Sequence, residues 1–328
     1  MPWRLTTDPY KIWLSEIILQ QTRVAQGLPY YERFVARFPT VQDLAAASQE
    51  EVLKLWQGLG YYSRGRNLHT TAQYITDELQ GVFPNTYKEL LTLKGVGDYT
   101  ASAIASISFN EPTAVVDGNV YRVLSRVFGI KTPVNSTQGQ KEFKALAQEL
   151  IDPKQPATFN QAIMEFGAIQ CKPQNPHCLV CVFQESCIAF RTQTIPSLPV
   201  KIKKTKIKKR HLHFLVFISN NQKTILQQRT GKGIWQGLYE FPMIEMESGK
   251  ERFRESASFI KKLSPYKVLS ITQHNDTPIV HKLSHQHLHT TFWVIKVEKI
   301  NTQSIPLSQV NDYPVPVLIS KFIDAFNF

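Results

Sequence analysis

Apolar residues recur at helical spacing through the first part of the chain, from residue 8 to about residue 190. Prolines and closely spaced glycines interrupt this pattern, so it predicts a series of short helices and not a few long ones. Segments in which apolar and polar residues alternate, as they do in half-buried strands, are not found in this stretch. The pattern therefore predicts an all-α region.

Beyond residue 210 the pattern changes to that of a mixed α+β domain. Strands are predicted at 213–219, 224–228 and 290–298, with a two-asparagine turn between the first two, and one helix is predicted at 252–263. A chain of 328 residues is long enough for two domains, each with its own core. The predicted organisation is a helical domain at 1–190, a basic linker at 191–210 and the α+β domain at 211–328.

The charge balance adds a prediction about partners. Lys and Arg number 38 against 26 acidic residues, which gives a net charge of +12 and favours a polyanionic partner. Seven of the basic residues lie in 201–210 without an acid, which also fits a solvated tether between domains. The sequence has no apolar run of about 18 residues and no basic-then-apolar start. We therefore expect no membrane association and a cytoplasmic location.

All four cysteines fall in one short window with the spacing C-x6-C-x2-C-x5-C: Cys171, Cys178, Cys181 and Cys187. In a cytoplasmic chain of this length such a window is not a disulfide framework. Four thiolates this close can enclose either a tetrahedral zinc ion or a cubane iron–sulfur cluster. Zinc sites usually present two C-x2-C pairs, whereas here a single pair is flanked by wider steps. The spacing therefore favours a [4Fe–4S] cluster over zinc.

Gly95 and Gly97 lie between two predicted helices, at 86–93 and 98–108. Two glycines spaced G-x-G let the backbone turn tightly and expose its N–H groups at a helix N-terminus. Such a turn can bind a phosphate without any sequence readout. An ordinary turn between two helices is the alternative interpretation.

Two carboxylates are candidates for acid–base chemistry. Glu16 belongs to a predicted helix that starts at Asp8-Pro9, and apolar residues cover most of that helix's circumference. We expect Glu16 to be partly buried, and burial raises a carboxyl pKa and makes the group a possible proton donor. Asp117 ends an apolar stretch and precedes a predicted helix at 118–124. Taken alone, Asp117 could also be a simple helix N-cap.

Three features in this order resemble the helix-hairpin-helix DNA glycosylases that carry an iron–sulfur cluster: the cysteine spacing, the Leu-x-Gly-Val-Gly hairpin and the Val-Asp-Gly-Asn-Val segment. Within that superfamily the chain resembles the MutY-type adenine DNA glycosylases over essentially its whole length. The motifs that carry this second resemblance are Pro-Trp-Arg at 2–4, Trp-Leu-Ser-Glu at 13–16, Leu-Gln-Gln-Thr at 19–22 and Gly-Leu-Gly-Tyr-Tyr-Ser-Arg at 58–64.

The segment 233–242 resembles the Nudix-like domain that is fused to these glycosylases. A working Nudix hydrolase has a metal-binding Arg-Glu-x-x-Glu-Glu helix, and the sequence at 254–258 does not match it. We therefore expect this domain to read DNA and not to hydrolyse pyrophosphates.

The resemblance implies an enzyme of base excision repair that hydrolyses the N-glycosidic bond of adenine mispaired with 8-oxoguanine or guanine. It implies that Glu16 protonates adenine as the general acid and that Asp117 stabilises the cation that forms on the sugar. Tyr99 and Asn119 match residues that line the catalytic site. The implied partner is double-stranded DNA, bound by a monomer associated with the nucleoid.

The resemblance also implies residues that contact the bases, since a target adenine must leave the duplex before it can react. The adenine pocket is expected to include Trp3, Arg4 and Gln161. The contacts that wedge the duplex, or stack beside the opposite base, are expected from Gln21, Thr22, Leu59 and Tyr61. The loop Leu283-Ser284-His285 matches a Phe-Ser-His loop that contacts 8-oxoguanine, with leucine in place of phenylalanine.

Tyr99 separates the main interpretation from its nearest alternative. The endonuclease III type has a Schiff-base lysine at this hairpin position, so tyrosine predicts a glycosylase without lyase activity. The alternatives are an endonuclease III-like pyrimidine glycosylase and lyase, or a non-catalytic iron–sulfur protein that binds DNA. The family carries a short helical segment before Pro-Trp-Arg, and this sequence starts directly ahead of that motif. We therefore expect Trp3 and Arg4 to fray.

Overall fold

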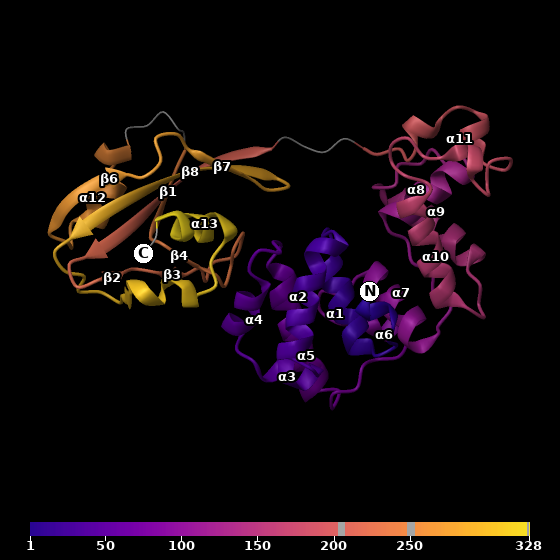
Figure 1. Ribbon diagram of the computed structural model, residues 1–328, viewed down its shortest axis with the longest axis horizontal. Helices are drawn as coiled ribbons and strands as arrows, with labels where there is room; N and C mark the ends of the chain where they lie inside the picture. The colour runs from indigo at the N-terminus through magenta and orange to yellow at the C-terminus, as the bar shows by residue number, and fades with distance from the viewer. Residues whose placement is uncertain (203–206, 248–252, 327) are drawn as a thin grey trace. The chain divides into compact units, whose positions relative to one another are not determined.

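Figure 1 shows the chain as a computed structural model, which describes residues 1–202, 207–247, 253–326 and 328. Parts of two predictions lie outside the described residues: Lys203, Lys204 and Lys206 of the basic run, and Arg252 of the predicted helix at 252–263. Among the described residues, no helix is both long enough and apolar enough to span a membrane.

The chain divides into two units. The first unit comprises Met1–Ala46 and Asn67–Lys204, and it is helical. The second comprises Ala47–Arg66 and Thr205–Phe328, and its sheet is built entirely from the C-terminal segment. The predicted combination of an all-α region and an α+β region is therefore confirmed.

Local capping fixes the starts of the two helices that carry the candidate carboxylates. Asp8 accepts a hydrogen bond from the backbone N–H of Tyr10 at 3.0 Å and begins α1 (Pro9–Leu19). Asp117 accepts two backbone N–H groups and begins α8 (Gly118–Val127). Both predicted helix starts are confirmed. Further helices of this unit are α2 (Val24–Arg37), α3 (Val41–Ala46), α9 (Thr137–Leu150), α10 (Pro156–Ile169) and α11 (Ile188–Arg191), with 3-10 turns η1 (Pro2–Arg4), η2 (Cys178–Val180) and η3 (Ile195–Ser197).

The hairpin joins α6 (Tyr87–Leu90) to α7 (Asp98–Phe109). Gly95 has a left-handed φ of +81°, and a Cβ on it would lie 2.8 Å from Cβ of Asn67, so only glycine fits. Gly97 has a φ of −98° and has open space where a Cβ would be. The predicted helix at 86–93 is wrong at its end, because residues 91–93 continue in tighter turns.

The second unit contains a sheet with strand order β5-β1-β8-β6, in which β7 also pairs with β8. β1 (Lys208–Ser219) and β8 (Gln286–Val297) run parallel, and the other strands are antiparallel to them. These others are β5 (Met243–Met246), β6 (Val268–Gln273) and β7 (Ile279–Lys282).

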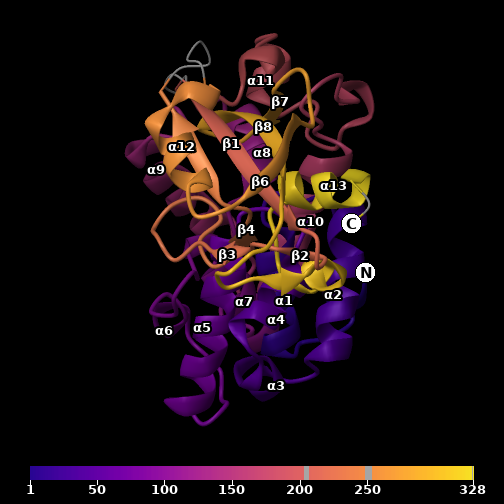
Figure 2. The same cartoon turned by 90° about the vertical axis from the view of Figure 1, so that its left-hand side faces the viewer.

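Helices cover both faces of this sheet (Figure 2). From α12 (Ala257–Leu263), Phe259 packs beside Trp293 in the apolar core of one face. On the other face, Phe322 of α13 (Val317–Phe326) stacks on Phe292 with ring centroids 4.2 Å apart. Strand β8 is therefore buried on both faces, and this explains its continuous run of apolar residues.

Three sequence predictions for this unit need correction. The predicted strand at 224–228 is two short strands, β2 (Lys223–Thr224) and β3 (Gln227–Gln228), which pair with different partners. Those partners are β9 (Ile305–Pro306) and β4 (Tyr239–Glu240). β8 begins at Gln286, before the predicted residue 290. The predicted helix at 252–263 is a 3-10 turn η4 (Phe253–Glu255) followed by α12, because Ser256 caps a new helix.

The segment Ala47–Arg66 belongs to the second unit although it precedes most of the first in sequence. Its helix α4 (Gln49–Trp56) carries Glu50, whose carboxylate accepts a hydrogen bond from the Tyr239 hydroxyl at 2.9 Å. Gln57 accepts from the N–H of Val315 at 3.1 Å and donates to Ser320 at 3.3 Å. Lys54 donates to a carbonyl of the turn η5 (Leu307–Asp312), and α5 (Ser63–Asp77) leads back into the first unit.

The region predicted as a linker, 191–210, is bound to the first unit at its start. The N–H of Val134 donates to the carbonyl of Val200 at 3.0 Å. The side chain of Asn135 pairs with both backbone groups of Ile202, at 2.8 Å and 3.0 Å. The last residues of the region, from Lys208, already belong to β1.

Candidate active site

Glu16 lies on α1, partly buried as expected, beside side chains from three other segments. Burial raises the pKa of Glu16 to about 7, and the negative charge of Asp117 acts in the same direction. A hydrogen bond from Tyr99 and the positive charge of Arg4 act against this rise. Glu16 is therefore a carboxyl group that holds its proton up to neutral pH.

Asp117 is held in one orientation at the start of α8. Its Oδ1 accepts the backbone N–H groups of Asn119 and Val120, both at 2.8 Å. Its Oδ2 accepts the side-chain amide of Asn119, also at 2.8 Å. Three donors thus surround this carboxyl group and fix its orientation. The N-cap interpretation and the catalytic interpretation of Asp117 are compatible, since one carboxylate can serve both.

Tyr99 comes from α7, immediately after the hairpin. Its hydroxyl is hydrogen-bonded to Glu16 and lies 3.8 Å from Sδ of Met164 on α10. Burial and the two carboxylates, Glu16 and Asp117, raise the pKa of Tyr99. The phenol therefore stays protonated and can orient Glu16.

The N-terminal turn η1 is packed against the helices. Trp3 is only 6% exposed, and its ring meets the ring of Tyr31 edge-on with centroids 5.0 Å apart. The expectation that this end frays is wrong, because a buried indole anchors it. Arg4 forms an ion pair of 2.7 Å with Glu165 on α10. Gln161 lies half-buried on the same helix, one turn before Glu165.

The four cysteines line one small cavity, together with apolar side chains that include Phe166 and Phe183. Burial raises the pKa of the Cys178 thiol, and the charges of the other three thiols act in the same direction. Arg126 lies 3.5 Å from Sγ of Cys171 and donates to two backbone carbonyls in the loop that follows, at 2.7 Å and 3.0 Å. The four thiols therefore face one cavity, which the buried guanidinium group of Arg126 also lines.

Arg122, one turn before Arg126 on α8, links the cysteine loop to the site of Asp117. It donates to the carbonyl of Cys171 at 2.7 Å, to that of Gly167 at 2.6 Å and to the side chain of Asn119 at 2.8 Å. A Cβ on Gly167 would lie 2.7 Å from Cβ of Asn119, so glycine is needed there. Arg122 was not predicted from the sequence, although two arginines four residues apart, set among apolar residues of one helix, are a usable signal because buried arginines are rare.

Tyr61 and Ser284, which are 223 residues apart in sequence, meet within the second unit. Their hydroxyl oxygens are 2.5 Å apart. Tyr61 has a left-handed φ of +46°, and Ser284 lies in the turn between β7 and β8, next to the exposed His285. Leu59 is buried, with 7% exposure. The structure therefore brings together two of the residues expected to contact the opposite base.

Gln21 and Thr22 lie directly after α1 in the first unit. Gln21 is exposed and has a left-handed φ of +56°, while the Thr22 hydroxyl donates to the carbonyl of Gln20 at 3.3 Å. A non-glycine residue at positive φ is uncommon and often occurs at functional sites. This geometry projects Gln21 away from the helix core.

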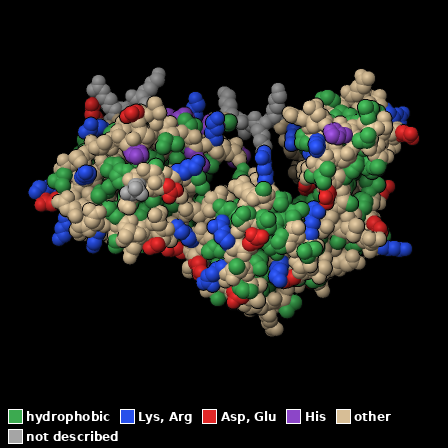
Figure 3. Space-filling model, in the orientation of Figure 1, with side chains coloured by type: hydrophobic (Ala, Val, Ile, Leu, Met, Phe, Trp, Pro, Cys, Tyr) green, Lys and Arg blue, Asp and Glu red, His purple; other side chains and the backbone are tan. Residues whose placement is uncertain are grey.

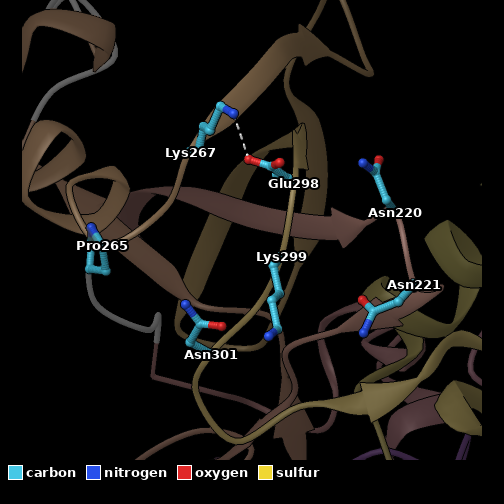
Figure 4. A pocket seen from close by; sticks show the side chains of 7 residues that line it. All are labelled: Asn220, Asn221, Pro265, Lys267, Glu298, Lys299 and Asn301. Carbon is cyan, nitrogen blue, oxygen red and sulfur yellow. Dashed lines mark ion pairs between the residues drawn. The ribbon is translucent and has the colours of Figure 1, made fainter.

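Lys and Arg side chains are distributed over both units on the face shown in Figure 3. A shallow depression in the second unit is lined by exposed side chains, among which Lys267 and Glu298 form an ion pair of 2.8 Å (Figure 4). It contains none of the predicted site residues.

Known proteins match both parts of the chain. Residues 14–153 match the family of HhH-GPD superfamily base excision DNA repair proteins, and residues 213–325 match the NUDIX domain. The chain is 33% identical to the adenine DNA glycosylase of Buchnera aphidicola subsp. Baizongia pistaciae over 302 residues, which cover 92% of this chain and 83% of that protein. It is 49% identical to the adenine DNA glycosylase of Homo sapiens over 198 residues, which cover 58% of this chain and 36% of that protein.

Two solved structures are similar to this chain over part of its length. A thermostable thymine-DNA glycosylase aligns with a TM-score of 0.55 and 30% identity, over 58% of this chain and 88% of that one. Endonuclease III in a non-covalent complex with DNA aligns with a TM-score of 0.51 and 24% identity, over 56% of this chain and 85% of that one, and this second likeness shows the fold alone. With Glu16, Tyr99 and Asp117 gathered at the hairpin and with relatives matched along nearly its whole length, the chain belongs to the adenine DNA glycosylase family of base excision repair enzymes.

Proposed function

We propose that this glycosylase removes adenine that is mispaired with 8-oxoguanine or guanine, by hydrolysis of the N-glycosidic bond. The observation that carries the proposal is the pairing of a buried carboxyl group, Glu16, with a second one, Asp117, that three hydrogen-bond donors hold in place. Burial keeps the proton on Glu16 up to a pKa of about 7, whereas three hydrogen-bond donors surround Asp117. Enzymes that cleave glycosidic bonds usually carry two carboxyl groups in different environments, one for each role.

Each carboxyl group has a step in this reaction. A neutral purine is a poor leaving group, so Glu16 donates its proton to adenine as the bond to the sugar breaks. Positive charge then develops on the sugar, and the carboxylate of Asp117, already oriented by its three hydrogen bonds, stabilises it. Tyr99 and Asn119 are positioning residues for Glu16 and Asp117 respectively.

Tyr99 also supports a reaction that ends at an abasic site. Forming a Schiff base requires an amine at the hairpin, and Tyr99 offers a protonated phenol instead. The product is then an intact strand that lacks one base. Treatment with borohydride during the reaction should trap no substantial covalent complex; efficient trapping would favour the lyase alternative.

The cysteine loop fits a [4Fe–4S] cluster. All four thiols line one cavity, yet among the described residues no three His, Cys, Asp or Glu side chains are grouped so that they could hold a single metal ion. The C-x6-C-x2-C-x5-C spacing of these cysteines in the sequence favours a cluster over one zinc ion. Bound to Cys171, Cys178, Cys181 and Cys187, the cluster would supply cross-links that fix the loop. Arg126 and Arg122 then hold that loop against α8.

Reading of the opposite base is assigned to the second unit. Oxidation of guanine turns N7 from an acceptor into a donor, and the Ser284 hydroxyl can accept from that N7–H. Tyr61, whose hydroxyl contacts Ser284, and the nearby Leu59 and His285 complete this set. Leu283 stands where the family loop has phenylalanine. In this chain, therefore, no aromatic ring from that position contacts 8-oxoguanine in the proposed recognition.

Double-stranded DNA containing the mispair is the proposed partner, bound by one copy of the chain in the nucleoid. Gly95 and Gly97 would present backbone N–H groups to a phosphate at the start of α7. Trp3, Arg4 and Gln161 would surround the extruded adenine. Gln21 and Thr22 would occupy the space that adenine leaves in the duplex.

Single-turnover excision assays test the proposal. Among duplexes that differ only in the base opposite adenine, those with 8-oxoguanine or guanine there should lose the adenine faster than the one with thymine. Glu16→Gln keeps the shape of the side chain but removes the acid, so it should bind the mispair and lose excision by about 10²-fold or more. Excision by Glu16→Gln within a few-fold of wild type would show that Glu16 is not the acid.

A further inference from the structure

Arg4 forms an ion pair with one carboxyl group and acts electrostatically on a second. Its Nη1 is 2.7 Å from Oε2 of Glu165, and its positive charge also acts on Glu16. The two side chains of the ion pair are 34% and 46% exposed, so the pair contributes little to folding stability. Its position, and not its strength, is what requires an explanation.

The charged and titratable groups that act on Glu16 come from three elements around α1. Tyr99 belongs to α7, Asp117 precedes α8, and Arg4 belongs to η1. Glu165 belongs to α10, which packs on both α7 and α8, and it reaches this group through Arg4. Met164, its neighbour on α10, contacts the Tyr99 hydroxyl at 3.8 Å. This turn of α10 therefore borders the same site.

We propose that Glu165 is a positioning residue for base excision: it holds the Arg4 guanidinium at the adenine pocket and offsets part of the positive charge that Arg4 presents to Glu16. The inference rests on the proposed role of Glu16 as the general acid. It adds a fourth element, α10, to the electrostatics of that acid.

The expected consequence follows from the signs of the charges. Without Glu165 the full charge of Arg4 acts on Glu16, and a nearby positive charge favours the ionised carboxylate. The pKa of Glu16 would then fall from about 7. Because the acid is needed in its protonated form, excision would begin to decline at a lower pH.

Glu165→Gln tests this in a single-turnover pH profile measured with saturating enzyme. The basic limb of the profile should move down by about half a pH unit, so the rate at pH 8 falls about threefold while the rate at about pH 5 is unchanged. Glu149→Gln, which removes an exposed glutamate from α9, is the matched control and should leave the limb in place. Glu165→Asp keeps the charge and should also leave the limb close to its wild-type position.

A double-mutant cycle shows whether Glu165 acts through Arg4. Arg4→Met should move the limb to higher pH, because it removes the positive charge near Glu16. In the Arg4→Met background, Glu165→Gln should produce no further shift. A shift of the same size in both backgrounds would show that Glu165 acts on Glu16 directly, and this would overturn the proposal.

Other outcomes separate this inference from the proposed function. Equal rate losses for Glu165→Gln at every pH, with an unchanged thermal midpoint, would mean that Glu165 only shapes the pocket, and the inference would be wrong. A wild-type profile without a basic limb near neutrality would instead refute the role of Glu16. If Glu165→Gln fails to fold, Glu165→Asp and Arg4→Met test the inference in its place. It requires the basic limb to stay in place with Glu165→Asp and to move to higher pH with Arg4→Met. It fails if Glu165→Asp moves the limb as far as Arg4→Met does.

Discussion

Folding buries Glu16 and removes the water that stabilises its ionised form. The free energy of unfolding therefore depends on pH. The pKa of Glu16 is about 7 in the folded protein against an ordinary 4.5, so the folded state binds this proton more tightly than the unfolded state. The stabilisation is fully present below about pH 4.5 and is lost as the pH rises through about 7. At 1.36 kcal/mol per pKa unit the loss is about 3 kcal/mol.

Glu16→Gln removes this dependence, because glutamine does not titrate. In denaturant unfolding, wild type should lose about 3 kcal/mol relative to Glu16→Gln between pH 5 and pH 8. The variant should therefore be the more stable protein at pH 8 although it has lost its activity. Parallel curves for the two proteins across this range would mean that Glu16 is not desolvated in the fold.

Ser284 provides a second test at the residue scale. The N7–H of 8-oxoguanine needs an acceptor, and an unpaired donor in a desolvated contact costs about 1–3 kcal/mol. Ser284→Ala should therefore lower the preference for 8-oxoguanine over guanine opposite adenine by roughly tenfold. Binding and single-turnover rates on both duplexes measure this preference.

Tyr61→Phe is the matched variant for that experiment. It removes the hydroxyl that contacts Ser284 in the DNA-free protein but keeps the ring and leaves the serine acceptor in place. Its preference for the lesion should stay close to that of wild type. Equal losses on both duplexes with Ser284→Ala would show that this serine only supports the turn between β7 and β8.

At the scale of elements, the hairpin contains two glycines with different requirements. Gly95→Ala places a Cβ at a φ of +81° and 2.8 Å from Asn67, so it should destabilise the protein by about 1–3 kcal/mol. Gly97→Ala meets no neighbour and has an ordinary φ, so its thermal midpoint should stay near that of wild type. It should nevertheless weaken binding to undamaged duplex DNA, because the methyl group lies where a phosphate would approach. Normal DNA affinity for Gly97→Ala would argue that the hairpin is an ordinary helix connection.

The elements that sequence predicted well have local causes. α1 and α8 begin at side chains that cap their own N–H groups, and α7 begins directly after a G-x-G turn, so a few adjacent residues determine each start. The strands were predicted less accurately than the helices. β2 and β3 have two residues each, and their partners β9 and β4 lie elsewhere in the sequence. β6 and β7 are half-exposed strands along one edge of β8, where burial imposes no strict alternation.

The candidate site shows the same division between local and distant causes. Glu16, Tyr99, Asp117 and the cysteines were found because their motifs are contiguous. Glu165 was not found, since its partner Arg4 is 161 residues away, and no local pattern relates them. Arg122 is similar, because two of its partners lie 45 and 49 residues further along the chain. Long-range polar contacts of this kind become visible only in the folded chain.

At the scale of the whole molecule, the cysteine loop makes a prediction about composition. The protein purified without oxygen should be brown and contain about four irons per chain. Cys178→Ser should lower that iron content and the thermal midpoint together, because the loop from Cys171 is held to α8 through Arg126 and Arg122. Metal analysis and thermal unfolding measure both, and a full equivalent of zinc without iron would contradict the cluster.

The discontinuous second unit also sets an order of events during synthesis on the ribosome. α4 and Gln57 are made early, but Ser320, the hydrogen-bond partner of Gln57, is made 263 residues later. At about 5–20 residues per second this interval lasts roughly 10 to 50 s. Once Lys204 has been made the first unit has all of its own residues, whereas the segment Ala47–Arg66 still lacks its partners. The nascent chain must therefore keep this segment from binding elsewhere until the last helix emerges.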